Sequence, residues 1–172
     1  MTSTRKALLH PAAIAASLLA ATAAAHADQK VLLENGAWRA VEATQGGEHV
    51  CFVISSPTTR APADLKRDPG NLFVTTKPAR EGGSEVSIRF GYRLAAGPHT
   101  MTIDGRAFPL MPQGETAWLQ SAGDEKTALS LFRSGRDLQI SARSGRGNAT
   151  VDTYSLIGFS AAFDALERQC RP

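Results

Sequence analysis

Residues 151–170 read VDTYSLIGFSAAFDALERQC, and the pattern of this stretch changes at Gly158. Before that glycine, β-branched and aromatic side chains predict a strand over residues 150–156, because such side chains fit a pleated, half-buried surface. After it, apolar residues recur at the spacing of one helical face. The predicted helix has only about three turns, so it must pack on the rest of the chain to be stable. Its apolar face carries Phe159, Ala162, Phe163, Leu166 and Cys170.

The N-terminus has the pattern of a secretory signal peptide. Two basic residues and an Ala-rich apolar segment precede Ala25-His26-Ala27, which matches the small-x-small pattern of a cleavage site. We expect cleavage between Ala27 and Asp28, and therefore a periplasmic or secreted protein. A membrane anchor is the alternative, which the weakly hydrophobic alanines disfavour. No transmembrane segment is expected once residues 1–27 are removed.

Residues 28–172 have the length of a single domain. The formal net charge of the whole chain is +3, and two of its basic residues belong to the leader. The rest is close to neutral and has no basic helix or aromatic–basic platform. A nucleic-acid partner is therefore not expected.

The chain contains two cysteines, Cys51 and Cys170. In an exported protein such a pair usually forms a disulfide. Cys51 lies in the run 49–55, which is apolar on both faces, as in a central strand. A Cys51–Cys170 bond would tie the terminal helix to the sheet, whereas the alternative is two free thiols. The sequence has no Cys-x-x-Cys motif that would indicate a redox-active pair.

Short runs typical of strands, separated by Gly and Pro turns, recur at roughly ten-residue spacing. The clearest is 86–92, where apolar and polar residues alternate. The pattern predicts an all-β fold, an antiparallel β-sandwich with one short C-terminal α-helix. Residues 127–132 and 138–142 are expected to form a hairpin across Ser134-Gly135-Arg136. The other strands are expected at 31–33, 38–43, 49–55, 72–76, 86–92, 99–103, 106–111, 116–120 and 150–156.

Residues 56–71 differ from the rest of the chain, because prolines and charged residues replace the strand pattern. They predict a long surface loop that ends in the turn Asp68-Pro69-Gly70. Long loops are uncommon in compact domains and often carry function. The alternative is a solvated connection between two sheets.

The sequence identifies no catalytic residue, metal ligand or cofactor-binding residue. His49 and His99 belong to no metal-binding motif and are expected to be partly exposed at strand ends. No Gly-x-Ser-x-Gly motif is present. An enzyme is therefore not expected, although a small periplasmic hydrolase or glycan-active enzyme that uses His99 and scattered carboxylates is an alternative. The carboxylates considered lie in predicted turns, and they are Asp104, Asp124, Glu125 and Asp137.

The tetrapeptide Arg-Ser-Gly-Arg occurs twice, at residues 133–136 and 143–146. If the two copies lie in neighbouring turns, their guanidinium groups form a cluster that binds carboxylate, phosphate or sulfate. This hypothesis predicts a partner such as an anionic lipid headgroup or an acidic glycan. The alternative is a pair of solvated turns. The candidate anion-binding residues are Arg133, Arg136, Arg143 and Arg146.

Several motifs together resemble one family of exported proteins. They are Trp38, the run Cys51-x-x-Ile54-Ser-Ser-Pro57, the run Leu72-Phe-Val-Thr75, Val86 to Tyr92 around Gly91, Arg133-Ser-Gly135, Gly147, and Asp152-Thr-Tyr-Ser-Leu-x-Gly-Phe-Ser-Ala-Ala with Cys170. The chain resembles the invasion-associated locus B family from alphaproteobacteria over nearly all of residues 28–172. The closing motif is the most specific part of the resemblance.

The resemblance implies an immunoglobulin-like β-sandwich that is exported and has no established enzymatic mechanism. The founding member of the family is linked to invasion of host erythrocytes, and no active-site residue is implied. We therefore expect a non-enzymatic binding or interaction protein whose partner is a protein, an envelope component, or an anionic glycan or lipid. A structural or stress-related envelope protein is a further alternative.

Overall fold

The structure is a computed structural model that describes residues 29–45, 47–77 and 83–170. The predicted leader and its cleavage site between Ala27 and Asp28 lie outside these residues. Within them, the strands form one antiparallel sheet of eleven strands in the order β1-β2-β3-β5-β6-β9-β8-β7-β10-β11-β4. The strands are β1 (Gln29–Asn35), β2 (Trp38–Gln45), β3 (Glu48–Ser55), β4 (Thr59–Ala61), β5 (Asn71–Thr76), β6 (Ser84–Arg89), β7 (His99–Ile103), β8 (Arg106–Gln113), β9 (Thr116–Leu119), β10 (Asp137–Arg143) and β11 (Ala149–Ser155).

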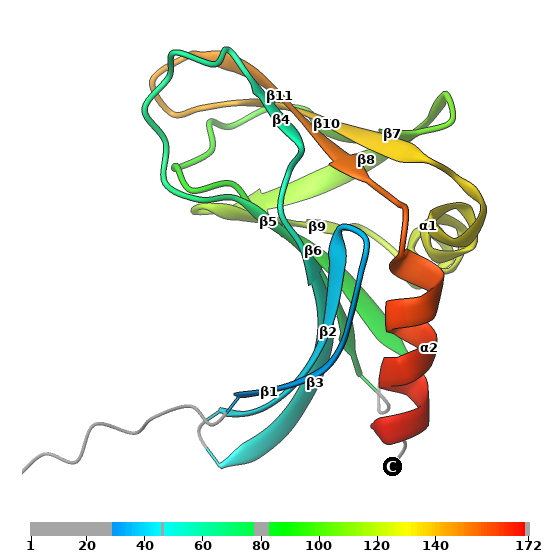
Figure 1. Ribbon diagram of the computed structural model, residues 1–172. Helices are drawn as coiled ribbons and strands as arrows, with labels where there is room; N and C mark the ends of the chain where they lie inside the picture. Colours follow the sequence, from blue (N-terminus) through cyan, green and yellow to red (C-terminus); the bar gives the residue numbers. More distant parts are fainter. Residues whose placement is uncertain (1–28, 46, 78–82, 171–172) are drawn as a thin grey trace, which may run out of the picture.

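The sheet is strongly bent, so that its two halves enclose the core between them (Figure 1). One half holds β1, β2 and β3, and the other holds β7, β8, β10 and β11. Side chains alternate between buried and exposed along most strands, as in β10, where Leu138, Ile140 and Ala142 face the core. This arrangement confirms the predicted all-β, antiparallel sandwich-type fold.

A second helix, α1 (Ala122–Ser134), replaces the hairpin strand that was predicted at residues 127–132. That prediction was wrong, as was the expectation of a single helix. The Ser121 side chain caps the helix by accepting a hydrogen bond of 3.1 Å from the backbone N–H of Asp124. Ala128 and Phe132, one helical turn apart, are buried against the core. A run of only six residues fits both the two-residue repeat of a strand and the 3.6-residue repeat of a helix. Here the N-cap and the contacts with the core favour the helix.

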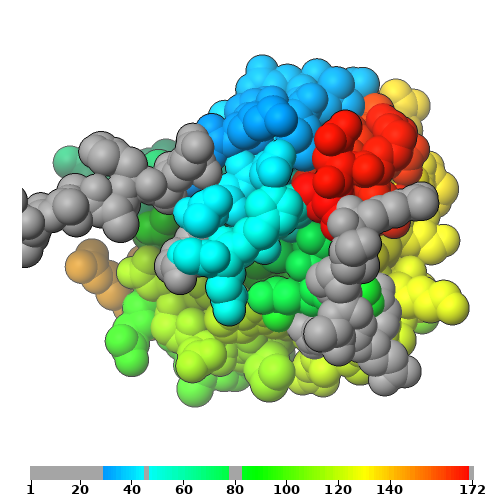
Figure 2. All heavy atoms as spheres, turned by 90° about the horizontal axis from the view of Figure 1, so that it is seen from below, coloured from blue at the N-terminus to red at the C-terminus, as the bar shows by residue number. Residues whose placement is uncertain are grey.

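The C-terminal helix α2 (Phe159–Gln169) forms where the sequence predicts it. It packs on β1, β2 and β3 and contacts α1. Figure 2 shows it from below, in red, beside the blue N-terminal strands and the yellow α1. The predicted disulfide between Cys51 on β3 and Cys170 at the end of α2 is present, and it spans 119 residues of sequence. The sheet and the last helix are thus covalently linked.

An aromatic cluster fills the space between the helices and the sheet. The ring of Phe159 lies 5.0 Å from that of Trp38 and 5.2 Å from that of Phe132, both in edge-to-face geometry. The indole N–H of Trp38 donates to the Ser155 carbonyl at 2.9 Å, so the polar atom of this buried ring has a partner. Trp38 therefore joins the start of β2 to the end of β11.

The change from strand to helix occurs at Gly158, which has a left-handed backbone with φ 97°. A Cβ atom at this position would overlap the Asn35 carbonyl in the β1–β2 turn. The preceding carbonyl, that of Ile157, accepts a hydrogen bond of 3.2 Å from the backbone N–H of Ala37. Only glycine allows the backbone to turn this close to the hairpin, and the turn places α2 over β1–β3.

Candidate functional site

A polar groove with a volume of about 760 Å³ lies at the end of the sheet away from the two helices. Because β10 follows α1 and β11 leads to α2, the turn between β10 and β11 is at the far end from both helices (Figure 1). The groove is lined by residues 65–68, residues 91–93, Glu115 and parts of the turn 144–150. Four segments that are distant in sequence therefore meet at one site.

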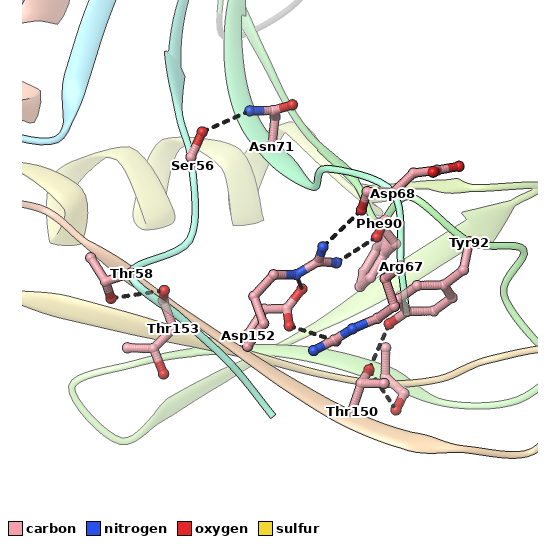
Figure 3. Close-up of polar contacts among 12 residues, drawn as sticks. Ser56, Thr58, Arg67, Asp68, Asn71, Phe90, Tyr92, Thr150, Asp152 and Thr153 are labelled. Atoms are coloured by element: carbon pink, nitrogen blue, oxygen red, sulfur yellow. Dashed lines mark hydrogen bonds and ion pairs between the residues drawn. The ribbon is translucent and has the colours of Figure 1, made fainter. Parts of the chain in front are cut away.

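A buried carboxylate stands behind the groove. Asp152 lies on β11 with only 3% of its side chain exposed, and it forms ion pairs with two arginines. Its Oδ2 accepts from Nε of Arg60 at 3.1 Å, and its Oδ1 accepts from Nη1 of Arg67 at 3.0 Å. Figure 3 shows the contact between Asp152 and Arg67. One negative charge thus meets two positive charges, and this network has a net positive charge.

The same two arginines hold one wall of the groove, which is formed by residues 65–68. Arg60 donates to the carbonyls of Asp68 at 2.8 Å and of Phe90 at 2.7 Å. Arg67 donates to the Pro62 carbonyl at 3.1 Å. The segment 56–71, predicted as a surface loop, also contains β4, which pairs with β11. It is therefore a fixed wall of the groove as well as a connection between strands.

Tyr92 lines the groove and points its hydroxyl at Thr150 (Figure 3), with 2.6 Å between the two oxygens. The Thr150 hydroxyl is within 3.3 Å of the Ala142 carbonyl, which only accepts. Thr150 therefore donates to Ala142, and Tyr92 donates to Thr150. The Tyr92 oxygen keeps lone pairs that can accept a hydrogen bond from a ligand.

Both tyrosines of the chain are expected to ionise above the ordinary pKa of 10.0. Burial raises the pKa of Tyr92, and burial together with the nearby Asp152 carboxylate raises the pKa of Tyr154. The folded state then keeps protons that the unfolded state has lost. The two protonated tyrosines therefore contribute to the free energy of unfolding. This contribution is fully present below pH 10 and is lost as the pH rises through the folded-state pKa values. Spectrophotometric titration of tyrosinate, in buffer and in denaturant, measures this difference. Coincident titration curves would contradict the expectation.

The approach of the wall to residues 90–93 requires glycine at position 91. Gly91 has φ 71°, and a Cβ atom there would overlap the Asp68 carbonyl. Gly91→Ala is expected to lower the free energy of unfolding by about 2 kcal/mol and to displace the wall. Chemical denaturation measures the change. The control is Gly105→Ala, which has φ 80° but no atom within 4 Å of the added methyl, so it should cost about 1 kcal/mol. Equal costs would show that the contact with Asp68 is unimportant.

The structure does not bring the four predicted anion-binding arginines together. Arg133 ends α1 and pairs with Asp164 at 2.6 Å and Glu167 at 3.2 Å on α2. Arg136 and Arg143 lie at opposite ends of β10, about 20 Å apart at the usual rise per strand residue. Of the four, only Arg146 lines the groove. The predicted four-guanidinium cluster is therefore wrong, because the first Arg-Ser-Gly-Arg ends a helix rather than forming a hairpin.

Sequence reasoning did not single out Arg67, Tyr92 and Arg93, which line the groove, or Arg60 and Asp152, which lie behind it. Of these residues, only Asp152 could have been found from the sequence, because it is a carboxylate at a core-facing position of the predicted strand 150–156. A buried carboxylate requires a positive partner. The partners of Asp152 lie 92 and 85 residues away in sequence, so local patterns do not identify them.

The two histidines have different surroundings. His49 is exposed and lies 2.7 Å from Glu42. His99 is buried, which contradicts the predicted exposure; it begins β7, whose first residues lie beside the end of β10 in the sheet. Its Nε2 donates to the Ala95 carbonyl at 3.0 Å, and its Nδ1 accepts from the Arg143 N–H at 3.4 Å. Both ring nitrogens are thus engaged by backbone groups.

Among the residues that the structure describes there is neither a metal-binding cluster nor a membrane-spanning helix. No group of three or more His, Cys, Asp or Glu side chains in residues 29–45, 47–77 and 83–170 is arranged to hold a metal ion. Neither of the helices within these ranges has the length and apolar character needed to cross a membrane.

The molecule is thus one bent antiparallel sheet with a disulfide-linked C-terminal helix at one end and a groove lined mainly by charged and polar residues at the other. No protein-family model and no curated protein matches the chain. A solved structure does match, namely the crystal structure of invasion associated protein B from Bartonella henselae. The TM-score is 0.57 at 17% sequence identity, and the match covers 79% of this chain and 94% of that chain. The predicted resemblance is thus confirmed at the level of the fold.

Proposed function

We propose that this protein is an exported, non-enzymatic binding protein that holds an anionic partner in the groove. The observation that carries the proposal is the groove itself, built around the ion pairs of Asp152. Its volume of about 760 Å³ lies within the range of ligand sites, roughly 300–1,000 Å³. Burying charged groups is costly. The ion pairs of Asp152 are nevertheless buried, and they hold the wall of the groove in one position. This arrangement supports a binding site that is already formed before the ligand binds.

The charges of the groove favour an anionic partner. Its lining includes Lys66, Arg67, Arg93 and Arg146 against the carboxylates of Asp68 and Glu115. Arg93 and Arg146 are exposed, and neither side chain forms an ion pair with another of the described residues. Guanidinium groups bind carboxylate, sulfate and phosphate with paired hydrogen bonds.

Four observations support export and a binding role. The N-terminal residues have the pattern of a leader, and the two cysteines form a disulfide, which is typical of oxidising compartments. Both nitrogens of His99 bond to backbone groups, so a hydrolase that uses this histidine as a base is disfavoured. The protein of similar fold is named as invasion associated, and we propose an envelope or host-surface partner for this chain.

The proposal is tested by affinity capture from periplasmic and outer-membrane extract of the cells that produce the protein. The wild type is expected to retain a partner that the variant Arg93→Ala/Arg146→Ala does not retain. Arg39→Ala/Arg136→Ala is the matched control, because it also removes two positive charges, from exposed positions outside the groove. Equal capture by all three proteins would contradict the proposed site. Export is tested separately by N-terminal sequencing of the protein recovered from the periplasm or the medium, which should begin at Asp28.

A further inference from the structure

We infer that the ligand of the groove is an acidic saccharide, that is, a chain of sugar units that carries carboxylate or sulfate groups. This inference rests on the proposed function and names the ligand class of the same site. Three observations support it, namely the fixed positive charge of the groove, the carboxylates beside that charge, and the aromatic ring on its wall.

The positive charge is partly preorganised. The side chain of Arg67 is only 6% exposed and yet lines the groove. Two of its N–H groups bond to Asp152 and to the Pro62 carbonyl. A guanidinium has more donors than these two, so N–H groups remain for a ligand while the side chain stays fixed. The exposed Arg93 and Arg146 add two more guanidiniums around the same space. An acidic group of the ligand is expected to bind here.

The carboxylates in the groove favour a ligand with hydroxyl groups over a simple inorganic anion. Asp68 and Glu115 line the groove beside the arginines. They would repel a bare phosphate or sulfate, but they accept hydrogen bonds from hydroxyl groups. The Tyr92 oxygen, which donates to Thr150, also has acceptor capacity left. The groove is thus lined by both donors and acceptors, as a ligand with both acidic and hydroxyl groups requires.

The shape of the groove fits a ligand of several units. A volume of about 760 Å³ is far more than one inorganic ion needs and is in the range of larger ligands, roughly 300–1,000 Å³. The half-buried ring of Tyr92 provides a flat apolar surface against which the C–H face of a sugar ring can pack. Charge, hydroxyl acceptors and an aromatic surface therefore occur together in one groove.

The test is calorimetric titration of the purified protein with the trimer of galacturonic acid, the neutral trimer of galactose, and inorganic sulfate. The acidic trimer is expected to bind at least about tenfold more tightly than either of the others. Arg93→Ala and Arg146→Ala are each expected to weaken its binding about tenfold, whereas Arg136→Ala leaves it unchanged. Circular dichroism verifies that each variant is folded.

Glu115→Ala gives the sharpest discrimination, because its effects on two probes have opposite signs. Loss of this carboxylate should weaken binding of the acidic trimer, which loses a hydroxyl partner, and strengthen binding of sulfate, which is no longer repelled. If the variant strengthens the binding of both probes, the hydroxyl-recognition role is wrong. Equal binding of the acidic and neutral trimers would likewise overturn the inference.

Two further outcomes separate this inference from the proposed function. Vesicles of phosphatidylglycerol that bind through Arg93 and Arg146, with no binding of the trimers, would assign the groove to a lipid headgroup and overturn the saccharide. If no probe binds but capture from envelope extract still depends on these arginines, the ligand class is wrong and the proposed function stands. If groove-dependent capture is also absent, both are wrong.

Discussion

Asp152→Asn is expected to lower the free energy of unfolding by about 3–5 kcal/mol, the largest effect of any single substitution considered. The carboxylate is 97% buried, since 3% of its side chain is exposed, and its removal leaves Arg60 and Arg67 without their counter-charge. A buried charge that has lost its partner keeps its desolvation cost and loses the compensating attraction. Urea denaturation followed by circular dichroism measures the change.

The matched control is Asp137→Asn, the same chemical change at an exposed position of β10. It is expected to alter stability by less than about 0.5 kcal/mol. Adding Arg67→Met to Asp152→Asn should recover part of the loss, because it removes one of the two unpaired charges. A cost below about 1 kcal/mol for Asp152→Asn would show that the ion pairs contribute little.

Asp152→Asn should also weaken partner capture, although Asp152 is absent from the lining of the groove. Its effect is indirect, because Arg60 and Arg67 carry the hydrogen bonds that hold Asp68 and Pro62 in the wall. Asp152 is therefore a positioning residue. Hydrogen exchange should show faster exchange in residues 62–68 of the variant, a result that a simple loss of global stability does not predict.

Reduction of the Cys51–Cys170 disulfide is expected to lower the free energy of unfolding by about 4 kcal/mol. The bond closes a loop with a sequence separation of 119 residues, and its loss gives the unfolded chain far more conformational freedom. Denaturation with urea, with and without a thiol reductant, measures the difference.

The control for this experiment is the double variant Cys51→Ala/Cys170→Ala, whose stability should not respond to the reductant. Reduction should increase hydrogen exchange in α2 more than in β10 and β11, because α2 loses a covalent link and neither of these two strands carries one. Partner capture should persist in the reduced protein under native conditions, since the groove lies at the other end of the sheet. A change in stability below about 1 kcal/mol would contradict the chain-entropy account.

The helix α1 shows where a local pattern was insufficient. Residues 127–132 alternate closely enough to be interpreted as a strand, but Ala128 and Phe132 are also one helical turn apart. The capping residue Ser121 and the acidic Asp124 and Glu125 in the first turn indicate a helix start. The error had a consequence, because α1 ends where the hairpin turn Ser134-Gly135-Arg136 was expected. That region therefore contributes Arg133 to the contact with α2 and no residue to the groove.

Local sequence patterns were enough to predict the alternating strands, the switch at Gly158 from strand to helix, and the pairing of the two cysteines. They did not predict which strands are neighbours in the sheet, and therefore did not predict that Asp152 pairs with Arg60 and Arg67 behind the groove. Periodicity and turn residues specify local conformation, whereas strand order depends on burying all apolar faces in one core at once.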